Sequence, residues 1–205
     1  MTIAYKGDDY HGFATNPGVE TVASVIEGAL AQILQEPIKI TPAGRTDAGV
    51  HAWGQVIGFD LPDRVNLEVL AKQLNALCGP SIAVREYAWT TPDFHARYSA
   101  MWRAYRYTVL NSPVPNPFLV NTAWQITTPL KIKAMQLASD AIIGEHDFSA
   151  FCRKPKPALG WRLFNLTTVR RQIPQRCHFS NGTTFLRKWL ACRKSLDLAL
   201  LPSIR

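Results

Sequence analysis

The spacing of apolar residues along the first 90 residues predicts two amphipathic helices and several strands. From Val22 to Leu34 apolar residues recur every three or four positions, as in a helix that buries one face. A second helix is expected from Leu67 to Cys78, with leucines on one face. Strands are predicted at residues 2–5, 38–41, 52–60 and 82–87. The resulting order, β-α-β-β-α-β, is that of the split βαβ or ferredoxin-like unit.

Both helices carry capping signals. Thr21 and Asn66 directly precede them, and side-chain oxygens of these residue types accept hydrogen bonds from first-turn N–H groups. Pro37 and the Gly79-Pro80 pair follow the helix ends, where the chain is expected to turn.

The pattern beyond residue 90 is less regular. Residues 98–110 are predicted to form a strand with Arg103, Tyr105 and Tyr107 on one face. Interleaved arginine and aromatic side chains suit an RNA-binding strand, although a strand with aromatic core residues and exposed arginines fits equally well. Further elements are expected as strands at 124–126, 161–170 and 176–180 and helices at 129–143 and 184–200. They indicate a second βα half, with a ligand cleft between the halves.

One polar stretch interrupts the apolar pattern before the predicted strand 52–60. It runs from Ala43 to Ala52 and combines Arg45, Thr46, Asp47 and two glycines with a histidine. Arg45 and Asp47 are two residues apart, so on an extended segment they project to the same side. The guanidinium favours the ionised form of the carboxylate. The residues alone leave two interpretations open: a turn closed by a surface ion pair, or a functional loop.

Composition limits the class of protein. The chain has 205 residues, of which 47% are hydrophobic and 19% charged, so it can hold one large or two small globular domains. It has no apolar run of about 18 residues, so no membrane span is expected. The four cysteines lie far apart, which indicates reduced thiols in a cytoplasmic protein. Asp8, Asp9 and His11 share one short loop, which is too little to predict a metal site.

Charge is distributed unevenly. Residues 1–147 carry 11 basic and 14 acidic side chains, whereas residues 148–205 carry 12 basic and one acidic. Such asymmetry favours a polyanionic partner, most simply a nucleic acid. A solvated basic face is one alternative, and a tail that is not natural protein sequence is another.

The polar stretch resembles a known signature. Ala43–His51, followed by Gly54-Gln55-Val56, is similar to the motif of the TruA family of tRNA pseudouridine synthases. The resemblance extends, in order, over Ile3–Phe13, Phe94–Ala100, Tyr105–Tyr107 and Gly144–Phe148. It covers about residues 1–153.

The resemblance implies an isomerase that converts uridine to pseudouridine at positions 38 to 40 of the tRNA anticodon stem-loop. It implies a homodimer that needs no metal or organic cofactor. By motif position, Asp47 matches the catalytic aspartate, Arg45 the arginine placed near it and the flipped base, and Tyr105 the tyrosine that stacks on the target base. It also implies the α+β pseudouridine synthase fold, in which two ferredoxin-like halves share a central antiparallel sheet and enclose the active-site cleft. The halves would be residues 1–93, with the catalytic loop, and residues 98–205.

The second half departs from the family after about residue 153, so it is expected to be truncated or divergent. The family has a Met-Val-Arg segment whose arginine enters the active site, and Ala191 stands at that position here. One hypothesis is that the tail is read out of frame, at least beyond Lys188. Either Arg187 or Arg193 would then substitute for the missing arginine, or the chain would be impaired. The rival to the enzyme is a catalytically impaired RNA-binding protein on the same scaffold.

Overall fold

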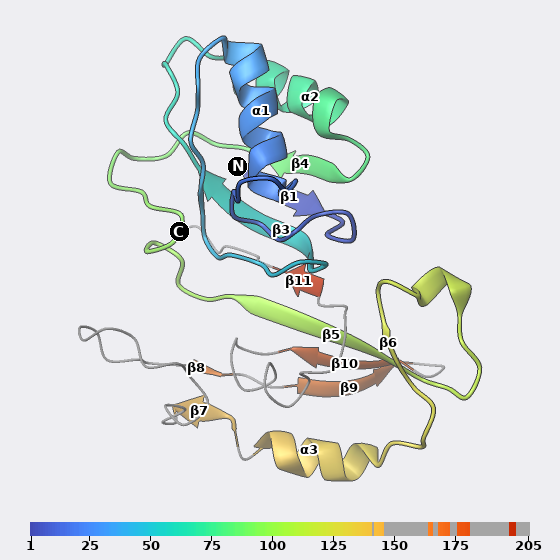
Figure 1. Cartoon of the computed structure of the whole chain (residues 1–205). Coiled ribbons are helices and arrows are strands. Elements are labelled where there is room, and N and C mark those ends of the chain that lie inside the picture. Colours follow the sequence, from blue (N-terminus) through green and yellow to red (C-terminus); the bar gives the residue numbers. More distant parts are fainter. Residues whose placement is uncertain (141, 146–163, 166–167, 173–175, 181–196, 200–205) are drawn as a thin grey trace. The chain divides into compact units, whose positions relative to one another are not determined.

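The computed structural model describes residues 1–140, 142–145, 164–165, 168–172, 176–180 and 197–199 (Figure 1). Two compact units are present: Met1–Arg103 with Leu198–Arg205, and Ala104–Asp197. Both contain antiparallel strand pairs, and helices occur in each, so the protein is of the mixed α+β class that the sequence predicts.

The first unit contains a small antiparallel sheet with two helices on one side (Figure 1). β1 (Thr2–Tyr5) pairs with both β3 (His51–Gly58) and β4 (Ile82–Glu86). The two-residue β2 (Thr41–Pro42) pairs with β3, which gives the order β4-β1-β3-β2. α1 (Val22–Leu34) packs against α2 (Leu67–Cys78), and α2 contacts β4. The β-α-β-β-α-β order of elements is the predicted one.

The core of this unit lies between the sheet and the helices. α1 buries the apolar positions that recur at helical spacing, among them Val22, Ile26 and Leu30. α2 buries Leu70 and Leu74 in the same way. Apolar burial of this kind is the main stabilising contribution to a small domain.

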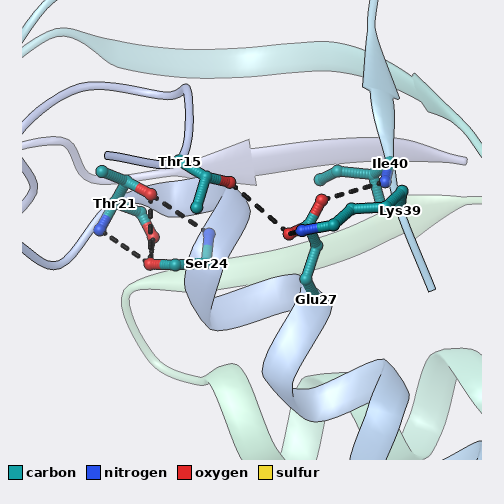
Figure 2. A network of polar contacts seen from close by, with 6 residues as sticks. All are labelled: Thr15, Thr21, Ser24, Glu27, Lys39 and Ile40. Carbon is teal, nitrogen blue, oxygen red and sulfur yellow. Dashed lines mark hydrogen bonds and ion pairs between the residues drawn. The ribbon is translucent and has the colours of Figure 1, made fainter. Parts of the chain in front are cut away.

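Both predicted helix caps are confirmed. The Thr21 hydroxyl accepts a hydrogen bond from the Ser24 amide at 3.1 Å, and the Ser24 hydroxyl accepts one from the Thr21 amide at 2.9 Å (Figure 2). This reciprocal capping box satisfies two donors that the helix itself leaves unpaired. In α2 the Asn66 side chain accepts from the amides of Glu68 and Val69.

The predicted strand at 38–41 is wrong for residues 38–40. The Ile40 amide donates to Glu27 Oε1 at 3.2 Å instead of to a neighbouring strand, and Lys39 Nζ lies 2.8 Å from Glu27 Oε2 (Figure 2). A carboxylate from α1 thus takes the donor that a sheet would need, and pairing begins only at Thr41.

The second unit is built around β5 (Ala104–Asn111). β5 pairs in parallel with β6 (Trp124–Ile126) and antiparallel with β10 (Arg176–Ser180). β10 pairs in turn with β9 (Thr168–Gln172). The remaining elements of this unit are the 3₁₀ turn Pro117–Leu119, α3 (Ile132–Asp140), and the paired β7 (Gly144–Glu145) and β8 (Phe164–Asn165). β11 (Asp197–Ala199) begins at the last residue of this unit, and its other two residues belong to the first unit.

Several predictions for this region need correction. The strand expected from residue 98 begins only at Ala104, because the amides of Tyr98 and Ser99 both donate to the His95 carbonyl in a turn. The helix expected at 129–143 is shorter, and Leu137 on it is 72% exposed. The helix expected at 184–200 is wrong at 197–199, which form a strand, and the rest of it lies outside the described residues.

The capping box supports a stability prediction. Thr21→Ala is expected to lower the free energy of unfolding by about 1–2 kcal/mol, because it removes the cap of a buried helix end. Urea denaturation followed by circular dichroism measures the change. Thr15→Ala is the matched control: Thr15 is exposed and makes only a 3.5 Å contact with Glu27 (Figure 2), so a change below about 0.5 kcal/mol is expected. Equal losses in both variants would contradict the assignment.

Candidate active site

The polar stretch contains the loop between β2 and β3, and exposure alternates over its three residues Arg45, Thr46 and Asp47. Ala43 and Thr46 are buried, with 4% and 6% exposure, whereas Arg45 and Asp47 are exposed. The carboxylate and the guanidinium therefore both reach solvent, while the residue between them faces the protein. This is the alternation expected of an extended segment.

Thr46 anchors the loop immediately before Asp47. Its hydroxyl shares a 2.8 Å hydrogen bond with the hydroxyl of Tyr5 on β1, and its carbonyl accepts from the Phe13 amide at 3.0 Å. Tyr5 is 4% exposed and Phe13 is 1% exposed. Because the hydroxyl and the carbonyl of Thr46 are both bonded in a dry environment, the peptide that leads into Asp47 is held firmly.

Two glycines allow the segment 7–13 to approach this loop. Gly12 has a φ of +93°, and a Cβ there would lie 3.0 Å from the Thr46 carbonyl oxygen. A Cβ on Gly7 would lie 2.1 Å from the Val50 carbonyl oxygen. Any larger residue at either position would push the two segments apart.

His51 fixes the far end of the loop. Its Nδ1 accepts a hydrogen bond from the Gly7 amide at 3.0 Å, and its Nε2 lies 3.4 Å from Asp8 Oδ1. In the neutral ring the proton must therefore lie on Nε2, where it faces the carboxylate. Lys6 Nζ lies 3.1 Å from the other oxygen of Asp8. Sequence reasoning had not linked Asp8 to His51, because 43 residues separate them.

The near end of the loop is held by two long side chains. Gln55, which is fully buried, accepts from the Gly44 amide at 3.3 Å and donates to the Gly44 carbonyl at 2.6 Å. Arg103 Nη2 donates to the carbonyl oxygens of Ala43 at 2.8 Å and Arg97 at 3.0 Å. Every stretch of the loop that flanks Arg45 and Asp47 is thus fixed by hydrogen bonds.

Tyr105 lies in the second unit, on β5, where it is half-buried between Ala104 and the exposed Arg106. Arg45 and Asp47 lie in the first unit. Ala191, Arg187 and Arg193 lie outside the described residues, as does most of the basic segment after residue 148.

A cavity of about 480 Å³ lies in the first unit, at the end of β3 away from the loop. Its lining includes Ile57, Trp89 and His95, and no residue of the Ala43–His51 loop. Among the described residues, no group of three or more histidine, cysteine or acidic side chains is placed to hold a metal ion. None of the helices described is long and apolar enough to cross a membrane.

The arrangement has a definite chemical capacity. An exposed carboxylate on a rigid loop can act as a nucleophile or can stabilise positive charge that develops at a sugar carbon. A neighbouring guanidinium presents planar donors that suit a base or a phosphate.

Comparisons with known proteins agree with the motif. A family model for tRNA pseudouridine synthase matches residues 1–99. The chain is 38% identical over 175 residues to tRNA pseudouridine synthase A of Limosilactobacillus fermentum, covering 83% of this chain and 68% of the relative. It is 40% identical over 184 residues to the enzyme of the same name from Moorella thermoacetica, covering 89% of this chain and 72% of the relative. It is 39% identical over 151 residues to that of Syntrophotalea carbinolica, covering 74% of this chain and 60% of the relative. The chain thus spans 60% to 72% of the length of these three relatives.

The buried Tyr5–Thr46 hydrogen bond can be tested by a double-mutant cycle. Tyr5→Phe is expected to destabilise the protein by about 1–2 kcal/mol, because it leaves a buried threonine hydroxyl without this partner. Adding Thr46→Val removes that hydroxyl and should recover part of the loss. Denaturant unfolding of the two single variants and the double variant measures the coupling. Strictly additive losses would show that the bond contributes nothing.

Proposed function

Because the chain belongs to the tRNA pseudouridine synthase A (TruA) family, we propose that it isomerises uridine to pseudouridine in tRNA. The observation that carries the proposal is the position of Asp47, an exposed carboxylate on a loop fixed on both sides. The target is uridine at positions 38 to 40 of the anticodon stem-loop, as the resemblance to the family implies. The comparisons favour this enzyme over an RNA-binding protein without turnover.

Asp47 supplies the reactive carboxylate. The N1–C1′ bond of the uridine breaks, the uracil turns, and a C5–C1′ bond forms. The proton on C5 is then lost and N1 gains one, so the reaction is an isomerisation without redox change. Asp47 either attacks C1′ or stabilises the positive charge that develops there. The base must leave its stack before it can react.

Arg45 and Tyr105 complete the proposed site. Arg45 is close to the Asp47 carboxylate along the chain and contacts the flipped base. Tyr105 stacks on the same base. In this proposal residues 1–93 and 98–205 are two ferredoxin-like halves with the active-site cleft between them. The active form is a cytoplasmic homodimer that uses no cofactor, and Arg187 or Arg193 replaces the arginine that the family has at Ala191.

The role of Asp47 predicts loss of catalysis with retained binding. Asp47→Asn is expected to reduce tritium release from tRNA labelled at C5 of uridine by at least about a thousandfold, as expected when a nucleophile is removed. Its affinity for tRNA should stay within a few fold of the wild type. Asp63→Ala, which removes an exposed carboxylate on another loop, is the matched control and should release tritium normally. Binding of tRNA without release by the wild-type chain would instead support the impaired RNA-binding protein.

The role of Tyr105 predicts a different pattern. Tyr105→Phe keeps the aromatic face, so activity should fall less than about tenfold. Tyr105→Ala removes it, and KM for tRNA should rise by about tenfold or more, since stacking of one base contributes about 1–3 kcal/mol. Steady-state kinetics on an unmodified tRNA transcript measure both variants. Equal defects in the two would contradict a stacking role.

A further inference from the structure

His95, Arg97 and Tyr98 form a small aromatic and cationic surface cluster, here termed the 95–98 platform. The rings of His95 and Tyr98 lie 4.4 Å apart between centroids, at an interplanar angle of 35°. Arg97 Cζ lies 5.7 Å from the centre of the Tyr98 ring. Tyr98 is 76% exposed, so formation of the core does not explain its placement.

The platform is rigid for a surface segment. The His95 carbonyl accepts from the amides of Tyr98 at 3.0 Å and Ser99 at 2.8 Å. His95 Nδ1 accepts from the Arg97 amide at 3.2 Å, which fixes the ring against its own backbone. The His95 amide donates to the Ser99 hydroxyl at 3.0 Å. The backbone of the platform and the His95 ring are therefore held in place before any ligand arrives, which reduces the entropy lost on binding.

The platform is attached to the end of β3 and, through Arg103, to the start of the catalytic loop. Ala96, in its middle, is 3% exposed and packs on Gly58 of β3, where a Cβ would lie 3.6 Å from that of Ala96. Arg103 then bonds the carbonyl of Arg97 and the carbonyl of Ala43 with the same nitrogen. Ala43 lies four residues before Asp47, so the platform borders the start of the loop that carries the reactive carboxylate.

We propose that the 95–98 platform binds a nucleotide of the tRNA strand that flanks the target uridine. The flanking base stacks on the exposed aromatic surface, and the Arg97 guanidinium pairs with the adjoining phosphate. Aromatic rings and arginine planes are the usual stacking partners of unpaired RNA bases. This inference rests on the proposed function.

The charge of the first part of the chain makes a local basic group necessary. Residues 1–103 carry eight basic and 11 acidic side chains, so this region does not attract RNA by its net charge. An RNA strand that reaches Asp47 needs arginines placed close to the loop. Arg45 on the loop is one such arginine and the exposed Arg97 is a second, whereas the guanidinium of Arg103 is engaged with two backbone carbonyls.

The test removes the exposed ring and compares binding with turnover. Tyr98→Ala is expected to raise KM for an unmodified tRNA transcript about tenfold, with kcat within about twofold of the wild type. Tyr98→Trp keeps a stacking face and should restore a KM close to that of the wild type. Tyr87→Ala is the matched control: Tyr87 is 41% exposed and follows β4, so KM should be unchanged. An unchanged KM in Tyr98→Ala would overturn the proposal, as would a loss confined to kcat.

Direct binding separates this proposal from the proposed function. Fluorescence anisotropy with labelled tRNA requires no turnover, and Tyr98→Ala should weaken binding about tenfold even if the wild type forms no pseudouridine. Arg97→Ala should lower the slope of log affinity against log salt by about one, as expected for one lost phosphate contact. If the wild type forms pseudouridine but Tyr98→Ala binds tRNA normally, the role proposed for the 95–98 platform is wrong and the proposed function is unaffected.

Discussion

The candidate site depends on the burial of Thr46 between two exposed charged residues. The backbone that carries Asp47 sets where its exposed carboxylate can lie. Here the hydroxyl of Thr46 is bonded to Tyr5 and its carbonyl to the Phe13 amide. The charged neighbours are thereby displayed from a dry and hydrogen-bonded support, which is the arrangement that precise catalysis requires.

The first part of the fold could be predicted because its signals are local. The spacing of apolar residues in α1 and the caps Thr21 and Asn66 involve neighbours within one or two turns. The prediction of a strand at 38–41 was wrong because the Ile40 amide bonds Glu27 on α1. The spacing of residues in the sequence does not show that these two segments are neighbours. The strand predicted at 98–110 does not include its first residues, because the His95 carbonyl accepts hydrogen bonds from two amides in a turn. The alternation of side chains does not reveal that a turn competes with a strand there.

The same contrast applies to the site. The spacing of Arg45 and Asp47 predicted that the two side chains project to the same side of an extended segment, and both side chains are exposed. The supports come from elsewhere in the chain: Tyr5 bonds Thr46 across 41 residues, Gly7 bonds His51 across 44, and Arg103 bonds Ala43 across 60. Arg103 had been placed on the face of an RNA-binding strand, but its guanidinium bonds two carbonyls, which gives it a structural part in holding the loop.

The division of charge along the chain suggests how the two requirements of an RNA enzyme are separated. Long-range attraction of a polyanion scales with net charge, and the excess of basic residues lies at 148–205. The loop with Asp47 lies in a region of net negative charge, which would repel a phosphate backbone unless cations stood beside it. Arg45 is exposed on that loop. Arg97 is also exposed, and Arg103 bonds its carbonyl and so links it to the loop. Capture of tRNA and local alignment of its strand can therefore depend on different arginines, so that a defect in one leaves the other measurable.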